Sequence, residues 1–277
     1  MDRRLIFITL AFLVISLAFI ANKQISTGFF LDKGVELRGG NLVTISFNGA
    51  SFEQVSGMAD QLRSEYQVSA YPVTTAIGTQ LSIEETEETN SSALLQKVNS
   101  TLSVKTYEIS TIDPKLSSGL IIEIMKGILI AFAGMAVIIF LLFRVPIPSF
   151  AIILAAFSDL VMTVFLMNLL GIQLNMATFT ALLMLLGYYV DTNILLTSRT
   201  LREKGNFDAN YKSTLKTGLT MVIASITAMI AVILIAGSSS VFGQLATVII
   251  IGLAVDVPNT WIQNAVILDW YKEKYNK

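Results

Sequence analysis

Long apolar stretches alternate with short polar ones along most of this chain. Six stretches are long enough to cross a bilayer as helices, because a hydrocarbon core of about 30 Å needs about 20 apolar residues in helical form. They cover residues 5–21, 119–143, 149–168, 175–197, 217–236 and 243–268. The first is longer than the apolar core of a signal peptide and lacks a small-residue cleavage site after it, so we interpret it as a retained helix.

The polar stretch between the first two helices shows two other periods. Alternating apolar positions predict strands in VTISF (43–47), QVSAYPVT (67–74), TQLSIEE (79–85) and VKTYEIS (104–110). Apolar residues at helical spacing predict helices over 51–66 and 90–102. The resulting order, β-α-β-β-α-β, is that of the ferredoxin-like split unit. Gly39 and Gly40 precede the first strand and allow a tight turn with positive φ.

These patterns together predict a membrane α-helical bundle of six transmembrane helices, with an external α+β ferredoxin-like (βαββαβ) domain inserted between helices 1 and 2. We expect three divisions of the chain: transmembrane helix 1 in residues 1–27, the ferredoxin-like domain in 28–115, and a five-helix transmembrane bundle in 116–277. A domain of this size is also compatible with a simple folded spacer, and both roles stay open.

Composition supports a membrane protein and narrows its chemistry. The chain is 53% hydrophobic and only 14% charged, with a mean hydropathy of +0.67, whereas soluble domains carry about 25% charged residues. A net charge of −1 gives no indication of a nucleic-acid partner. Cys and His are both absent, which removes thiol and imidazole chemistry and the usual zinc ligands. We expect no metal, no cofactor and no enzymatic activity.

The distribution of positive charge predicts how the chain crosses the cytoplasmic membrane, since cytoplasmic loops are enriched in Lys and Arg. Basic residues gather at alternate helix ends: Arg3, Arg4, Arg144, Arg199, Arg202, Lys204, Lys212, Lys216, Lys272, Lys274 and Lys277. The short opposite loops, 169–174 and 237–242, contain neither Lys nor Arg. We therefore expect a multi-pass protein with both termini in the cytoplasm and residues 28–115 on the extracytoplasmic side.

Three carboxylates lie well inside the predicted spans: Asp159, Asp191 and Asp256. An ionised Asp at the centre of a membrane helix costs roughly 2.5–3.5 kcal/mol on insertion scales, and no basic residue lies deep enough to be an obvious partner. Such an Asp either stays neutral and bridges helices through hydrogen bonds, or it loses and regains a proton along a transport path. We favour the second interpretation for Asp191 and leave both open for the other two.

Helical spacing shows which residues share a face with each carboxylate. Around Asp191 these are Thr180, Met184, Gly187 and Ser198; around Asp256 they are Gly252, Asn259, Thr260 and Gln263; the fifth span carries Thr217, Thr220, Ala224, Thr227 and Ala231 at the same repeat. Small and hydroxyl residues let membrane helices approach and form hydrogen bonds. We expect the last three spans to pack polar face to polar face, with their Asp side chains inward.

Pro258 predicts a break in the last span. Its missing N–H leaves the Ala254 carbonyl without a helical partner, two residues before Asp256. That carbonyl could accept a hydrogen bond from water or from a protonated acid. The spacing Gly252-x-x-Val255-Asp256 also repeats Gly187-x-x-Val190-Asp191, so both glycines are candidate helix-packing positions.

The stretch LGYYVDTNILLTSRTLRE (186–203) resembles the SecD/SecF family of protein-export membrane proteins, within the resistance–nodulation–division superfamily. GVELRGGN (34–41) is similar to the Gly-Gly motif that opens the family's external domain, with Glu36 where the family usually has Asp. Residues 158–175 are similar to the third helix and following loop of SecF. The resemblance covers essentially the whole chain, and the single short external domain favours the SecF branch, in an archaeal form.

The resemblance implies a six-helix half that pairs with SecD into a pseudo-symmetric twelve-helix unit. That unit assists the Sec translocation channel late in export, and its bacterial forms are proton-driven. Implied partners are SecD, the Sec channel, the exported polypeptide and the lipid bilayer. Asp191, with Thr192 and Asn193, occupies the proton-relay motif one position before the bacterial SecF Asp, a rotation of about 100°. Asp159 matches the acid of the third helix, and Asp256 has no bacterial SecF counterpart that we place.

Two other functions stay open. Half of a proton-coupled small-molecule efflux transporter would have similar helices, although such pumps carry much larger external domains. An intramembrane aspartic protease would use two membrane Asp residues that share a proton. The Gly-x-Gly-Asp motif of those proteases is absent, and the helices of Asp191 and Asp256 run in the same direction rather than antiparallel.

Overall fold

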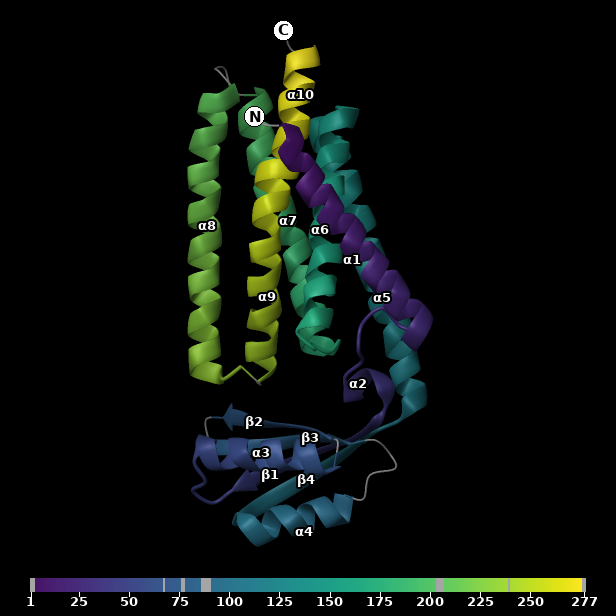
Figure 1. Ribbon diagram of the computed structural model, residues 1–277, viewed down its shortest axis with the longest axis vertical. Helices are drawn as coiled ribbons and strands as arrows, with labels where there is room; N and C mark the ends of the chain where they lie inside the picture. Colours follow the sequence, from purple (N-terminus) through teal and green to yellow (C-terminus); the bar gives the residue numbers. More distant parts are fainter. Residues whose placement is uncertain are drawn as a thin grey trace.

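The computed structural model describes residues 3–66, 68–75, 78–85, 91–202, 207–238 and 240–275. A long bundle of helices stands on a small sheet domain, and the two ends of the chain lie at the far end of the bundle (Figure 1). Lys204 and Lys277, which we expect on the cytoplasmic side, lie outside the described residues.

Six helical runs within the described residues are long and apolar enough to cross a membrane. They are α1 (Ile6–Thr27), α5 (Pro114–Phe143), α6 (Pro146–Leu169), α7 (Met176–Arg202), α8 (Phe207–Ala236), and a continuous run of α9 (Val241–Pro258), a π-helical segment (Asn259–Asn264) and α10 (Ala265–Tyr275). A 3₁₀ turn (Arg3–Leu5) precedes α1. Each run overlaps one predicted span. Several runs extend beyond the predicted spans. The largest difference is at α8, which begins at Phe207 and not near residue 217, so Lys212 and Lys216 lie on the helix.

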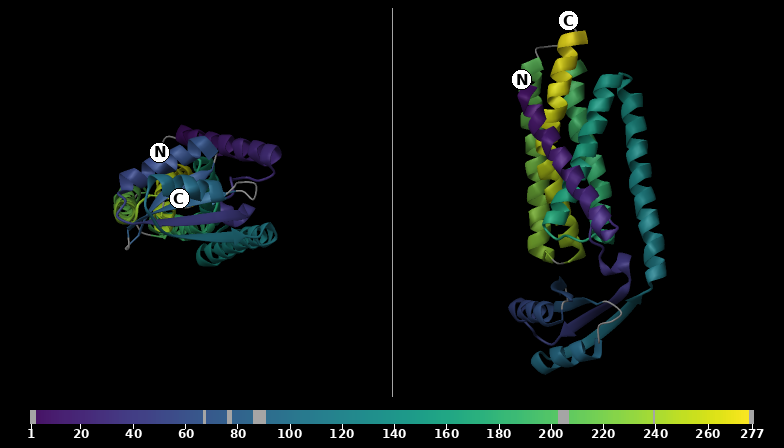
Figure 2. Two further views of the ribbon diagram at one scale, coloured as in Figure 1. Left: turned by 90° about the horizontal axis from the view of Figure 1, so that it is seen from below. Right: turned by 45° about the vertical axis from the view of Figure 1, so that its right-hand side comes forward.

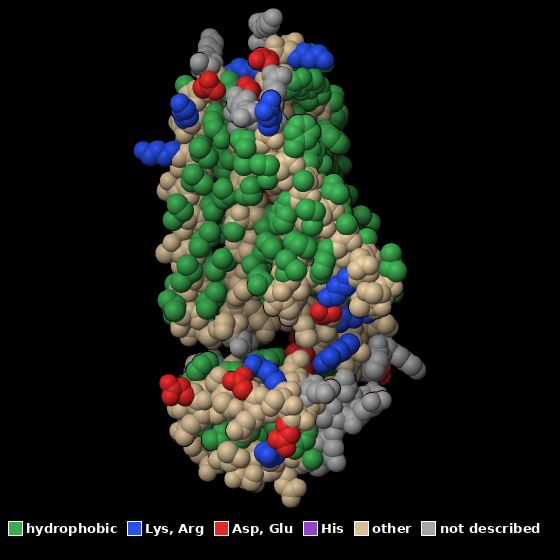
Figure 3. Space-filling model, in the orientation of Figure 1, with side chains coloured by type: hydrophobic (Ala, Val, Ile, Leu, Met, Phe, Trp, Pro, Cys, Tyr) green, Lys and Arg blue, Asp and Glu red, His purple; other side chains and the backbone are tan. Residues whose placement is uncertain are grey.

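The outside of the bundle is apolar over its middle, and charged side chains gather toward its ends (Figure 3). Highly exposed large apolar side chains lie on α1, α5 and α8, among them Phe7, Ile8, Leu129, Ile130, Leu234 and Ile235. Helix α5 runs along one side of the bundle and leads directly out of the sheet domain (Figure 2). This distribution is what a bilayer around the bundle requires.

The sheet domain has the strand and helix order that the sequence predicts. Its elements are β1 (Gly40–Phe47), α3 (Phe52–Tyr66), β2 (Ser69–Thr75), β3 (Gly78–Glu85), α4 (Ser91–Thr101) and β4 (Val104–Ile112). The described strands lie in the order β2-β3-β1-β4, and each neighbouring pair is antiparallel. Val43 and Ile45 of β1 are buried together with Leu62 of α3 and Val98 of α4, so both helices cover the same face of the sheet.

The Gly-Gly pair makes the sharp turn that leads into β1. Gly39 has a φ of 82° and Gly40 a φ of 133°, so the predicted positive φ is confirmed. A Cβ atom added to Gly40 would overlap the Glu85 carbonyl oxygen on β3. The residues just before the pair form a short helix, α2 (Val35–Arg38), which the sequence pattern does not predict.

We expect the fragment of residues 28–115 to fold by itself, because its helices and strands bury a core of their own. Circular dichroism of the purified fragment should show a mixed α and β spectrum and a cooperative thermal transition. A random-coil spectrum in buffer would contradict the assignment of an independent domain.

Gly40→Ala should destabilise that fragment by about 1–3 kcal/mol, because it combines a positive φ with a collision against backbone. Gly57→Ala in α3 is the matched control, since Gly57 has open space around it. An exposed helical Gly-to-Ala change should raise stability by about 0.5–1 kcal/mol. Urea unfolding of both variants measures the difference, and equal midpoints would refute the role of Gly40.

Candidate functional site

A layer of buried polar side chains fills the centre of the bundle where α6, α7 and the last span meet. Asp256 of α9 is only 1% exposed. The Thr192 hydroxyl of α7 lies 3.0 and 3.1 Å from its two carboxylate oxygens, and the Thr260 hydroxyl donates to Oδ1 at 2.7 Å. Two helical runs therefore hold one carboxylate through hydroxyl groups.

Asp159 of α6 lies in the same layer and is fully buried. Its Oδ1 accepts a hydrogen bond from Asn259 Nδ2 at 2.7 Å, while its Oδ2 has no hydrogen-bond partner among the described residues. The Thr163 hydroxyl donates to the Asp159 main-chain oxygen at 2.7 Å, and it lies 2.8 Å from the Tyr189 hydroxyl. Side chains of all three helical runs thus surround Asp159.

The π-helical segment supplies most of the amides in this layer. Asn264 donates to Asn193 Oδ1 at 2.7 Å, and Asn193 Nδ2 donates to the Tyr189 main-chain oxygen at 2.7 Å. Gln263 Nε2 donates to the Ser158 hydroxyl at 3.1 Å. The predicted polar face of Asp256, Asn259, Thr260 and Gln263 therefore does point inward.

The helix is not broken at Pro258, contrary to our expectation. It continues through residues 259–264 in π form, which places the carbonyl acceptor five residues before each N–H. Pro258 has no N–H to donate, so the ordinary pattern is interrupted there without a break in the helix. Single π turns are frequent at functional positions in helices.

Asp191 is exposed on the outer surface of the described bundle. Thr180, Met184 and Gly187 share its face as predicted, and they are exposed as well. The expectation that this face points inward is wrong, because the other side of α7 makes the hydrogen bonds to α6 and the last span. Asp191 lies ten residues, or about 15 Å of helical rise, from Leu201, where the apolar part of α7 ends.

The small-residue stripe of α8 also points outward, so the prediction that it faces the bundle is wrong. Thr220, Ala224, Thr227 and Ala231 are exposed, and Thr217 is half-buried. Helix α8 packs instead through buried Gly218, where an added Cβ atom would overlap the Trp261 ring.

The two candidate packing glycines lie in different surroundings. A Cβ atom at Gly252 would overlap the Leu185 side chain and the Tyr189 hydroxyl, so α7 and α9 approach closely there. Gly187 has open space around it and is exposed. The repeated Gly-x-x-Val-Asp spacing therefore does not mark equivalent positions.

No Lys or Arg within the described residues forms an ion pair with Asp159, Asp191 or Asp256. The same residues contain no group of three or more His, Cys, Asp or Glu side chains that could hold a metal ion. The chemistry that this layer offers is the holding and release of protons by carboxyl groups that hydroxyls and amides orient.

The Gly-Gly motif, GVELRGGN (34–41), lies at the junction of the bundle and the sheet domain. Glu36 Oε2 accepts a hydrogen bond from the main-chain N–H of Met176, the first residue of α7, at 2.9 Å. Three further residues are not indicated by any sequence pattern: Tyr189 and Thr163, which contact Asn193 and Asp159, and Glu84, which accepts from the Val35 main chain within the motif. Asn175-x-x-Thr178, a typical helix N-cap spacing, was a readable signal for the start of α7.

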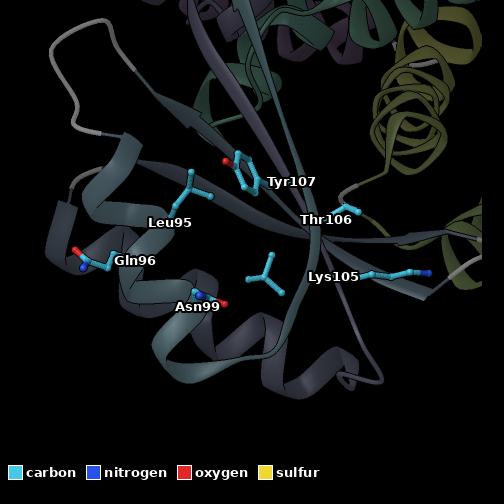
Figure 4. A pocket seen from close by; sticks show the side chains of 7 residues that line it. Leu95, Gln96, Asn99, Lys105, Thr106 and Tyr107 are labelled. Atoms are coloured by element: carbon cyan, nitrogen blue, oxygen red, sulfur yellow. The ribbon is translucent and has the colours of Figure 1, made fainter.

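A separate groove of about 690 Å³ opens between α4 and β4, in the sheet domain (Figure 4). Its lining is formed by Leu95, Gln96, Asn99, Val104, Lys105, Thr106 and Tyr107. It has no residue in common with the carboxylate layer, so we treat it as a feature of the sheet domain alone.

Comparison with known proteins agrees with this architecture. A family described as "Protein export membrane protein SecD/SecF, C-terminal" matches residues 90–274. The "Protein-export membrane protein SecF" of Haloferax volcanii is 34% identical, over 98% of this chain and 93% of that protein. The protein of the same name from Methanocaldococcus jannaschii is 36% identical, over 97% of this chain and 95% of that protein.

A solved structure has the same fold. The crystal structure of SecDF, a translocon-associated membrane protein from Thermus thermophilus, superposes with a TM-score of 0.67 at 18% sequence identity. The match covers 96% of this chain but only 38% of that longer chain. The described residues form six apolar helical runs with an inserted sheet domain, and the chain is 34% and 36% identical to these two archaeal relatives over nearly its whole length. This chain therefore belongs to the SecF family of protein-export membrane proteins.

Proposed function

We propose that this chain assists the passage of proteins through the Sec channel of the cytoplasmic membrane, as one half of a unit whose other half is SecD. The observation that carries the proposal is Asp191, a carboxylate at membrane depth on the outer face of α7. An exposed Asp against lipid is costly, and a partner half packed on this face would remove it from lipid.

The outer faces of α7 and α8 suit a helical partner. The residues around Asp191 include Gly187 and Thr180, and α8 adds Thr220, Ala224 and Thr227, all of them exposed. Small and hydroxyl side chains allow close helix packing and interhelical hydrogen bonds in membranes. The surface that we expected to face the bundle is, in this proposal, the surface that faces SecD.

Proton movement through the unit is the proposed source of work. Asp191 would lie at the junction of the two halves, while Asp256 and Asp159 lie in the polar layer behind it. Thr192 links the Asp256 carboxylate to α7, and Thr163, which donates to the Asp159 main-chain oxygen, lies 2.8 Å from the Tyr189 hydroxyl of α7. Moving one charge across 100 mV releases about 2.3 kcal/mol, enough to shift a two-state helix packing substantially.

The proposed topology places both termini in the cytoplasm and the sheet domain outside. The two ends of the chain lie together at the bundle end opposite the sheet (Figure 1), in line with the distribution of Lys and Arg. We also propose the divisions 1–27, 28–115 and 116–277, and the ferredoxin-like arrangement for the middle one. The antiparallel order β2-β3-β1-β4, with α3 and α4 on one face, supports it.

Asp191→Asn keeps the size of the side chain and removes its titration. It should abolish the stimulation of export in proteoliposomes that contain SecD and the Sec channel, while the protein stays folded and bound to SecD. Asp208→Asn, at the exposed start of α8, is the matched control and should leave export unchanged. Export at the parental rate by Asp191→Asn would refute a proton role for this carboxyl.

Thr192→Val removes the hydroxyl that α7 gives to Asp256 and keeps the side-chain shape. The buried carboxylate loses a donor, so we expect a loss of about 1–3 kcal/mol in stability, measured by thermal unfolding in detergent. Thr192→Ser retains the hydroxyl and should behave nearly as the parent. Equal unfolding temperatures for Thr192→Val and the parent would show that this contact does not hold α7 to α9.

A further inference from the structure

The short helix α2 stands between the sheet domain and the end of α7 (Figure 1). It is built from the GVELR part of the Gly-Gly motif, and the proposed function assigns it no task. Two residues of α2 make polar contacts with different parts of the protein. The Val35 main-chain N–H contacts the sheet, and the Glu36 carboxylate contacts the bundle.

A buried carboxylate of β3 holds the sheet side of α2. Glu84 is 7% exposed, and its Oε2 accepts a hydrogen bond from the Val35 main-chain N–H at 3.2 Å. The Tyr71 hydroxyl donates to Oε1 at 3.0 Å, and Arg38 Nη2 lies 3.9 Å from Oε2. Burial and the Glu84 charge raise the pKa of Tyr71, so its hydroxyl stays a donor to this carboxylate.

A second carboxylate holds the bundle side. Asn175 caps α7 by accepting from the Thr178 N–H at 2.9 Å, which leaves the Met176 N–H in need of another acceptor. Glu36 Oε2 supplies it at 2.9 Å. A negative charge at the N-terminus of a long helix is also favourable with respect to the helix dipole.

Main-chain contacts beside α2 fix the same junction. Gly34 N–H donates to the Leu174 oxygen at 2.8 Å, and Leu174 N–H donates to the Asp32 oxygen at 2.7 Å. A Cβ atom at Gly34 would lie 3.3 Å from the Leu174 oxygen, so a larger residue would crowd the pair. Residues 30–36, which precede β1, thus form hydrogen bonds to α6, to the loop after it and to the first residue of α7.

The junction is filled only in part: Leu31 and Leu37 are buried against the bundle core, but a cavity remains beside α2. A cavity of about 250 Å³ separates the membrane-facing side of the sheet from the ends of α7 and α9. Leu42, Thr44 and Ser82 line it from the sheet, and Met176, Val241 and Gln244 from the helices. The Glu84 and Glu36 contacts of α2 therefore form a polar connection between the sheet domain and the first residue of α7, in addition to the covalent passage from β4 into α5.

We propose that α2 is a mechanical link between the sheet domain and α7, made of two carboxylates in series: Glu84 fixes α2 to the sheet, and Glu36 fixes α2 to the first residue of α7. Glu36 and Glu84 are positioning residues, since they lie outside the carboxylate layer and accept hydrogen bonds from the main chain of Met176 and Val35. Displacement of the sheet domain is transmitted along α7, whose later turns carry Asp191 and Thr192. This inference rests on the proposed function for its purpose, but its geometry can be tested without export.

The test uses the full chain in nanodiscs with two spin labels. The chain has no native Cys, so Ser64→Cys on α3 and Lys212→Cys on α8, both exposed, label the sheet domain and the bundle. Glu36→Gln should increase the population outside the parental distance peak by about tenfold, as expected when a charged hydrogen-bond acceptor is lost. Glu84→Gln should do the same. Glu36→Asp, which retains a carboxylate, should restore most of the parental distribution, and exposed Glu53→Gln is the control.

Serial links predict a specific double-variant result. Because the two carboxylates hold the two sides of one link, loosening either side already weakens the connection between the sheet domain and α7. Glu36→Gln combined with Glu84→Gln should therefore broaden the distances no more than the stronger single variant does. Parental distances in Glu36→Gln, or additive broadening in the double variant, would overturn the link. Export assays with the same variants separate the two proposals. Broadened distances with normal export would support the mechanical link and contradict its role in export.

Discussion

The interior of a bilayer offers no water, so a polar group that this bundle buries is costly unless the protein itself supplies a hydrogen-bond partner. That constraint explains the centre of the structure. Thr192 and Thr260 hold the Asp256 carboxylate, and Asn259 holds Asp159. These contacts come from different helical runs, and they fix how α6, α7 and the last span sit against one another. The close approach at Gly252 is possible because that position has no side chain.

Much of this architecture could be predicted from the sequence, because it depends on local periods. A run of about 20 apolar residues predicts a membrane-spanning helix, and the alternation in VTISF predicts a half-buried strand. The same logic placed Asn259, Thr260 and Gln263 on the face of Asp256, where the structure has them. The turn at Gly39 and Gly40 could be predicted because positive φ values are a local property of the turn.

Which face of a helix points into the bundle cannot be predicted from local periods, since it depends on the neighbouring helices. Helix α7 is polar on two sides: Thr192 and Asn193 face the bundle, and Asp191, one residue earlier, faces out. Periodicity shows which residues share a face but not which face is inside. Glu84 was missed for a similar reason. Its carboxylate is buried by a segment 49 residues away, and no local pattern reveals that contact.

Both ends of the chain lie at one end of the bundle, away from the sheet domain. Six long helical runs in the described part of the chain, an even number, bring it back to the end of the bundle where it began, and this bears on how such chains can be joined. A second six-span half of the same topology can be joined covalently to either end by a short tether, without threading any connection through the lipid. Fusion of two such halves into one polypeptide therefore needs no rearrangement of the helices, and the longer Thermus thermophilus chain, of which this one matches 38%, has room for a second half.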